Sequence, residues 1–148
     1  MLKKIIAAIL GIPFLLIFLF VLYEFVGYTV NHRETERQTE LLENYILENI
    51  DDVDAVIDSA FFTGNTSGTG NHTDMMSVLV IKSDNDKKDI ETALKKEYKY
   101  IEVISGEDFD KDNYPYSKLK LNEIGDTKGI YVVCLIESAP FSDNIEGS

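Results

Sequence analysis

The chain has 148 residues, of which 45% are apolar, and it carries a formal net charge of −12 at pH 7. That length suits one folded domain with an appendage. The acidic balance disfavours binding to nucleic acid and to anionic lipid headgroups, and the single cysteine, Cys134, excludes an intramolecular disulfide.

The first predicted element is a membrane-spanning helix near the N-terminus. Residues 5–23 include no charged side chain, and at 1.5 Å per residue they cover about 28 Å, close to the thickness of the hydrocarbon layer. A cleaved signal peptide is the alternative, because positive charges precede the run. The run is longer than a signal core, however, and no small-x-small cleavage pattern follows it. We therefore expect a signal anchor over residues 5–28, in contact with the lipid bilayer, after a short cationic tail of residues 1–4.

The charges that flank this run predict its orientation. The amino terminus, Lys3 and Lys4 precede it, and Arg33 and Arg37 follow it. Positive residues favour the cytoplasmic side, and a short cationic tail is poorly translocated. The small excess predicts a single-pass protein of the cell membrane, with its N-terminus in the cytoplasm and its C-terminal domain extracytoplasmic.

The next predicted element is an amphipathic juxtamembrane helix over residues 29–50. Its apolar residues recur at helical spacing, with charges on the opposite face. They are Leu41, Leu42, Tyr45, Ile46 and Ile50. This helix is compatible with a direct continuation of the membrane helix.

Residues 51–140 predict a small acidic domain that contains both strands and a helix. Runs rich in β-branched, aromatic or alternating apolar residues predict five strands. These cover residues 53–62, 75–81, 100–105, 116–124 and 130–138. The second and the last are almost continuously apolar, as expected of strands that are buried on both faces. Ser83, followed by acidic residues, predicts the start of a helix that ends at a run of lysines.

This order of elements predicts an α+β fold. We expect a two-layer sandwich, in which two helices cover one face of a mostly antiparallel sheet of about five strands. A split βαβ arrangement fits the same order. We expect residues 141–148 to form a flexible tail.

The glycine-rich stretch "FFTGNTSGTGNHTD", residues 61–74, predicts a long hairpin connection. It has no Walker lysine and is followed by a strand rather than a helix, which argues against a phosphate site. Outside the membrane such a tip is a candidate contact surface, and Asn65, Asn71 and His72 are its possible partner contacts. Asn65 and Asn71 also begin Asn-x-Ser/Thr patterns, which matter only in a secretory cell.

Two groups of residues are weak candidate metal ligands. His72 and Asp74 supply an imidazole and a carboxylate, but two neighbouring side chains do not fill a coordination shell. Asp108, Asp110 and Asp112 match the first, third and fifth places of a calcium loop. The sixth place lacks the required glycine, and the twelfth lacks the bidentate glutamate. The sequence therefore predicts neither a metal nor another cofactor.

No catalytic set is recognisable, because Cys134 lies in an apolar strand and no G-x-S-x-G elbow is present. We expect a non-enzymatic, membrane-anchored extracytoplasmic binding or accessory protein that acts through protein–protein contacts, such as an immunity-type inhibitor or an assembly partner. Its acidity favours a basic protein partner. The first alternative is an envelope sensor for a small ligand or calcium, and the second alternative is an unrecognised hydrolase. An ordered pocket or ion site beside His72 or residues 107–113 would favour the sensor.

Overall fold

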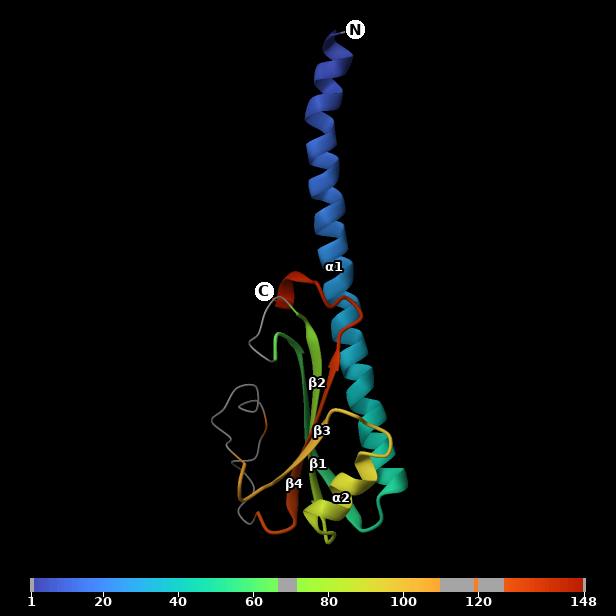
Figure 1. Ribbon diagram of the computed structural model, residues 1–148, viewed down its shortest axis with the longest axis vertical. Coiled ribbons are helices and arrows are strands. Elements are labelled where there is room, and N and C mark those ends of the chain that lie inside the picture. The colour runs from blue at the N-terminus through green and yellow to red at the C-terminus, as the bar shows by residue number, and fades with distance from the viewer. Residues whose placement is uncertain (1, 67–71, 110–118, 120–126, 148) are drawn as a thin grey trace.

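The computed structural model describes residues 2–66, 72–109, 119 and 127–147. Figure 1 shows one long helix and a small domain that is folded alongside its second half. The elements in chain order are α1 (Leu2–Asn49), β1 (Val53–Gly64), β2 (Asp74–Ser83), α2 (Lys87–Leu94), β3 (Ile101–Ser105), β4 (Ile130–Ser138) and the 3₁₀ turn η3 (Ile145–Gly147).

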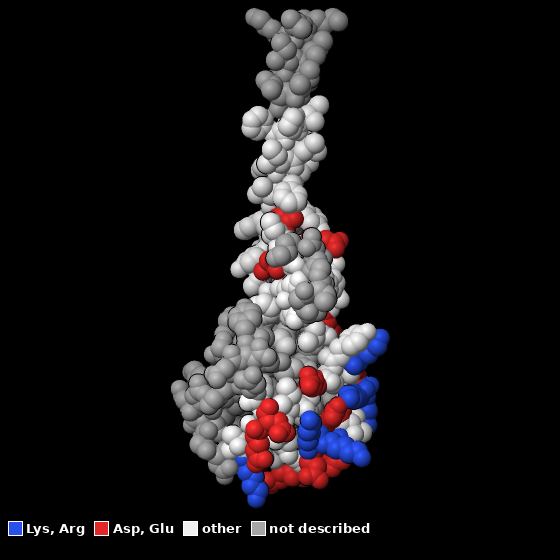
Figure 2. Space-filling model, turned by 60° about the vertical axis from the view of Figure 1, so that its left-hand side comes forward, with Lys and Arg blue, Asp and Glu red and all other residues white. Residues whose placement is uncertain are grey.

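Helix α1 joins the predicted membrane run and the predicted juxtamembrane helix without a break, and Pro13 lies inside it. Its part Gly11–Asn49 includes a window of mean hydropathy 2.0, long and apolar enough to cross a membrane, although a signal sequence meets the same criterion. The large apolar side chains from Ile12 to Phe25 are exposed. Figure 2 shows this described stretch free of charged side chains until the helix approaches the domain.

The sheet has four strands in the order β1-β2-β4-β3, and all neighbours are antiparallel. Because β4 lies between β2 and β3, the unit β2-α2-β3 is a split βαβ unit. The predicted mixed α+β class and antiparallel sheet are confirmed. The predicted number of five strands is not confirmed, because the predicted strand at residues 116–124 lies outside the described residues, except for Leu119.

Both faces of the sheet are buried. On one face, α1 and α2 share a core with the strands, formed by Leu42, Ile46, Ile50, Leu79, Ile81, Ile90, Leu94, Ile101, Val103, Val133 and Leu135. The other face carries a second cluster, formed by Met76, Val78, Val80, Leu119, Ile130, Val132 and Cys134. Burial on both sides explains why β2 and β4 are almost continuously apolar. It also means that the predicted two-layer sandwich is not established, because the second face is covered as well.

Several element boundaries differ from the predicted ones. Strand β1 continues to Gly64 and β2 begins at Asp74, with these two residues paired, so the hairpin connection is shorter than residues 61–74. Helix α2 begins after Asp86 rather than at Ser83. The Ser83 hydroxyl donates to the Asp52 carbonyl at 2.9 Å and accepts the Asn85 N–H at 3.1 Å, which stabilises the end of β2 instead of capping a helix.

The C-terminal residues, expected to form a flexible tail over residues 141–148, lie against α1 as far as Glu146, and Gly147 contacts the hairpin residue Asn65. Asn31 Nδ2 donates to the Phe141 carbonyl at 3.0 Å, and Asn31 Oδ1 accepts the Phe141 N–H at 2.9 Å. Gly27 permits the close approach, because a Cβ there would lie 2.5 Å from Asn144 Nδ2. Residues 141–146 are therefore packed against α1 between Tyr23 and His32, so they overlap the last residues of the predicted anchor, 5–28.

Candidate functional site

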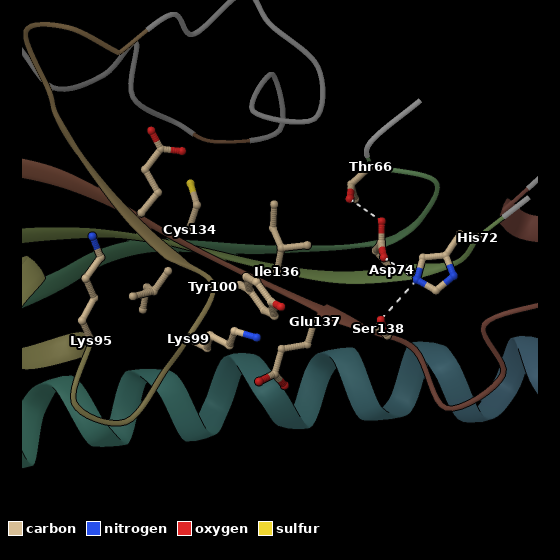
Figure 3. Close-up of a pocket in the computed structure, with 12 residues that line it drawn as sticks. Thr66, His72, Asp74, Lys95, Lys99, Tyr100, Cys134, Ile136, Glu137 and Ser138 are labelled. Atoms are coloured by element: carbon tan, nitrogen blue, oxygen red, sulfur yellow. Dashed lines mark hydrogen bonds and ion pairs between the residues drawn. The ribbon is translucent and has the colours of Figure 1, made fainter. Parts of the chain in front are cut away.

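A cavity of about 640 Å³ opens beside β4, at the end of the sheet that holds the hairpin connection. The cavity exists because β3 is shorter than β4. The first residue of β3, Ile101, pairs with Leu135, so residues 136–138 of β4 extend beyond β3. Figure 3 shows the lining side chains converging from the hairpin, from the α2–β3 connection and from β4. They are Thr66, His72, Asp74, Lys95, Lys99, Tyr100, Ile101, Glu102, Cys134, Ile136, Glu137 and Ser138.

One wall of the cavity is a hydrogen-bonded group around Asp74. Asp74 Oδ1 lies 3.1 Å from His72 Nε2, and Asp74 Oδ2 accepts a bond from Thr66 Oγ1 at 2.7 Å. His72 Nε2 also lies 3.2 Å from Ser138 Oγ. A Ser-His-Asp relay needs the acid and the serine on opposite ring nitrogens. Here both contact the same nitrogen, so this arrangement fixes the hairpin against β4 and gives Ser138 no activating base.

The predicted metal ligands are only partly brought together. His72 and Asp74 are in contact, but among the described residues no third His, Cys, Asp or Glu joins them in a group that could hold a metal ion. Asp108 lies in a turn after β3, where its N–H donates to the Ser105 carbonyl at 3.0 Å. Asp110 and Asp112 lie outside the described residues, so the calcium-loop prediction remains untested.

The other walls of the cavity carry charges of both signs over an apolar floor. Lys95, Lys99, Glu102 and Glu137 all line the cavity, together with the apolar side chain of Ile136, and Figure 3 shows Lys99 beside Glu137. A cavity of this volume with a few convergent polar groups suits a small molecule. The sequence did not single out these residues, because they come from separate segments. The only sign of a cavity in the sequence was the difference in length between the predicted strands at residues 100–105 and 130–138.

The structure describes two of the three predicted partner contacts of the hairpin, Asn65 and His72. Asn65 Nδ2 donates to the Gly147 carbonyl at 3.2 Å, so this side chain holds the C-terminal segment. His72 lies at the rim of the cavity with 40% of its side chain exposed. Asn71 lies outside the described residues. The described part of the hairpin is thus tied to the rest of the domain by its own side chains.

A second feature is the outer edge of β1, which pairs with β2 alone in the described part of the chain. The Ser59 N–H donates to Asp58 Oδ1 at 2.9 Å, and therefore points away from β2. Backbone groups alternate in direction along a strand, so Ser59, Phe61 and Thr63 direct theirs outward. Ser59 and Phe61 are exposed. A groove of about 470 Å³, lined by His32 and residues 59–63, runs beside them.

Neither the cavity nor the β1 edge can be interpreted through a relative. Comparison of the chain with protein-family models, with curated proteins and with solved structures gives no match in any of the three. A function must therefore be inferred from the geometry of these two features.

Proposed function

We propose that the chain is a membrane-anchored extracytoplasmic binding or accessory protein that acts through protein–protein contacts. In this proposal the uncharged run of α1, residues 5–23, crosses the bilayer, and the domain formed by the rest of the chain binds another protein. The observation that supports the proposal best is the outer edge of β1, which within the described part of the chain pairs with β2 alone and borders a groove.

Strand edges of this kind are usually blocked in monomeric proteins, because they can pair with another chain. Lysine, proline and bulges are the common blocking devices. Strand β1 has neither lysine nor proline. Its irregularities fall between Val53 and Asp58, whereas residues 59–64 pair regularly with β2 and carry no charge. The second half of β1 is therefore suited to accept a strand from a partner.

Photo-crosslinking in the native membrane tests this proposal. A photoreactive residue placed at Ser59 of the full chain should give a protein adduct of defined mass, because this position lies on the exposed edge. The matched control is Lys88, which is exposed on α2 and far from β1 in the sequence. Absence of an adduct at position 59, or equal adducts at positions 59 and 88, would contradict a contact through the β1 edge.

The orientation has its own test. In a Ser59→Cys variant, a membrane-impermeant maleimide should label intact cells, because the domain is proposed to be extracytoplasmic. The native Cys134 thiol is only 2% exposed and provides a low background. Labelling that requires permeabilised cells would instead place the domain in the cytoplasm.

A small-ligand sensor is the second candidate function, and the cavity beside His72 favours it. Its volume of about 640 Å³ falls in the range of small-molecule sites. A ligand-observed NMR screen against the full chain in micelles tests this candidate. Any compound found should lose binding in an Ile136→Trp variant, because the larger ring would fill the cavity floor. Compounds that bind this variant unchanged do not use the cavity.

A further inference from the structure

We infer that the C-terminal turn of the domain is a second membrane contact, in which Ile145 enters the interfacial layer of a zwitterionic bilayer beside the end of the anchor. This inference rests on the function proposed above, because it requires residues 5–23 to cross the membrane. Three observations carry it: the height of the turn along α1, the exposed apolar side chains at that height, and the charges around them.

The height of the turn is fixed by two hydrogen bonds to Glu24, the first residue after the uncharged run. Asn144 Nδ2 donates to the Glu24 carbonyl at 3.0 Å, and the Ile145 N–H donates to Glu24 Oε2 at 2.9 Å. Side chains of an α-helix lean toward its N-terminus, whereas its carbonyls point toward the C-terminus. The chain therefore advances toward the anchor from Asn144 to Ile145. In Figure 1 this turn is the part of the domain nearest to the apolar half of α1.

This height falls within the interfacial layer of a bilayer. A bilayer is about 40 to 45 Å thick and its hydrocarbon core about 30 Å, which leaves about 5 to 8 Å for the headgroups on each side. If the core ends near Tyr23, Glu24 lies about 1.5 Å beyond it and Tyr28 about 7.5 Å beyond it, at 1.5 Å per residue. The stretch from Glu24 to Tyr28, and Ile145 with it, therefore lies among the headgroups.

The side chains exposed at this height are large and apolar. Ile145 is 62% exposed and Phe25 is 67% exposed, and Val26 and Tyr28 are exposed as well. Aromatic side chains, tyrosine above all, are enriched in the interfacial layer, where an apolar ring is partly removed from water. Apolar surface that stays in contact with water gains no such free energy. Contact with the bilayer would therefore stabilise all four side chains.

The distribution of these side chains around α1 indicates that lipid covers them. At about 100° per residue, Phe25, Val26 and Tyr28 point in three different directions. The C-terminal segment, which carries Ile145, covers the side of Gly27, where a Cβ would lie 2.5 Å from Asn144 Nδ2. Another protein, or a second copy of this chain, would contact the helix from one side. A bilayer surrounds the helix and reaches every side at one height.

The charges at this height favour a zwitterionic surface. Residues 5–32 and 139–147 include neither lysine nor arginine, and their acidic residues are Glu24, Asp143 and Glu146. On the face shown in Figure 2, acidic but no basic side chains lie where α1 enters the domain. Anionic headgroups attract basic segments and repel acidic ones. The contact is therefore apolar in origin, and it is stronger on phosphatidylcholine than on a bilayer rich in phosphatidylglycerol.

Tryptophan fluorescence of the full chain tests the inference, because the native sequence contains no tryptophan. The reporter is Ile145→Trp. Phe18→Trp, inside the uncharged run and 62% exposed, is the control for contact with lipid. Leu47→Trp is the control for contact with water, because Leu47 is 50% exposed and lies about 36 Å beyond Tyr23 along α1. Each variant is reconstituted in phosphatidylcholine vesicles, with and without phosphatidylcholine that is brominated close to its headgroup.

We expect Ile145→Trp to emit at a shorter wavelength than Leu47→Trp and to lose much of its emission to the brominated lipid. Leu47→Trp should instead be quenched by iodide in the aqueous phase, to which Ile145→Trp should be less accessible. Equal iodide quenching of these two variants would overturn the inference. Short-wavelength emission from Ile145→Trp without quenching by brominated lipid would also overturn it, because protein, including a second copy of the chain, would then cover this position.

Two further comparisons complete the test. In an equimolar mixture of phosphatidylcholine and phosphatidylglycerol, with the share of brominated lipid unchanged, quenching of Ile145→Trp should decrease. Equal quenching in the two kinds of vesicle would overturn the preference for a zwitterionic surface. If brominated lipid quenches Phe18→Trp but not Ile145→Trp, this inference fails and the proposed anchor stands. If it quenches neither variant, the anchor of the proposed function fails as well.

Discussion

Two tyrosines at the border of the core, Tyr98 and Tyr131, lose their phenolic protons less readily than a free tyrosine does. Burial raises the pKa of Tyr98, and the nearby Glu97 raises it further. Burial also raises the pKa of Tyr131, with a contribution from Asp86. The Tyr131 hydroxyl also donates to the Asn85 carbonyl at 2.8 Å, whereas the Tyr98 ring packs edge-on against Tyr45 with centroids 5.3 Å apart.

The raised pKa of Tyr98 predicts a loss of stability at high pH. The unfolded chain releases this proton near the ordinary value of about 10, whereas the folded chain retains it to higher pH, so the free energy of unfolding falls as pH rises above about 10. We expect Tyr98→Phe to reduce that fall and to change little at neutral pH, because phenylalanine keeps the ring contact. Urea unfolding of the full chain in micelles, at about pH 8 and about pH 11, measures the difference.

The control for this prediction is Tyr100→Phe, because Tyr100 is 61% exposed. It should leave the pH dependence unchanged. Identical pH dependences for the native chain and for Tyr98→Phe would show that Tyr98 does not contribute.

Helix α1 changes the character of its buried face at Leu42. The buried residues that follow are apolar, whereas those before it are Asn31, Thr35, Gln38 and Thr39. These polar side chains form hydrogen bonds with the sheet. The Thr39 hydroxyl donates to Ser77 Oγ at 2.8 Å, and Ser77 Oγ donates to Gln38 Oε1 at 2.9 Å. Buried polar groups need such partners. The contact between helix and sheet is thus hydrogen-bonded near the apolar run and hydrophobic farther away.

The hydrophobic half of this contact predicts a large cost for truncation. Ile46→Ala should lower the free energy of unfolding by about 2 to 5 kcal/mol, because Ile46 is fully buried and its removal leaves a cavity. The adjacent Leu47 is 50% exposed, so Leu47→Ala should change stability by about 0.5 kcal/mol or less. Circular dichroism during urea unfolding of both full-length variants measures the two costs, and similar costs would contradict the assigned face of α1.

The elements that could be predicted from the sequence are those whose patterns report burial directly. The apolar runs of β2 and β4 predicted two doubly covered strands, and the spacing of Leu42, Ile46 and Ile50 predicted the helix. The polar residues at Asn31 and Thr35 have the same spacing, but a polar stripe is typical of a solvent face. Only the fold supplies their partners, which are distant in the sequence. The start of α2 was wrong for a similar reason, because Ser83 bonds to Asp52 rather than to the first turn of the helix.

The candidate sites were less predictable than the fold. His72 and Asp74 are two residues apart, so their contact could be expected. The remaining walls of the cavity, including Lys99 and Ser138, meet them only because β3 is shorter than β4, and a sequence pattern does not fix where a strand ends to within a few residues. The outward direction of the Ser59 N–H likewise depends on the register of β1 against β2, which includes two irregularities.

At the scale of the whole molecule, the C-terminal segment lies against the middle of α1, far from the N-terminus (Figure 1). The C-terminal segment, residues 139–147, contacts α1 where the helix leaves its apolar run. Glu146 Oε1 lies 2.7 Å from His32 Nε2, and the Ile145 N–H donates to Glu24 Oε2 at 2.9 Å. Tyr23 and Phe141 also pack together, with ring centroids 5.5 Å apart. These contacts hold the domain against α1 at the end of the domain that lies nearest to the predicted bilayer.

Asn31 is the residue on which this attachment depends most. It is fully buried and satisfies both backbone groups of Phe141. Asn31→Ala should cost about 1 to 3 kcal/mol, because it leaves these groups without partners. We expect faster hydrogen–deuterium exchange across residues 141–147, while β2 and β4 stay protected. The exposed Asn44 on the same helix provides the control variant, Asn44→Ala. Unchanged exchange at residues 141–147 would show that other contacts hold the segment.

The unbroken course of α1 determines where a partner can reach the β1 edge. If the hydrocarbon layer ends near Tyr23, where the C-terminal segment begins to cover α1, Thr35 stands about 18 Å above it and Ile50 about 40 Å above it, at 1.5 Å per residue. Strand β1 lies between these two heights, because Thr63 contacts Thr35 and Val53 packs near Ile50. A binding segment must therefore be presented within a few nanometres of the membrane. This favours a partner that is itself held at the same surface, so that the two proteins meet by lateral diffusion in two dimensions.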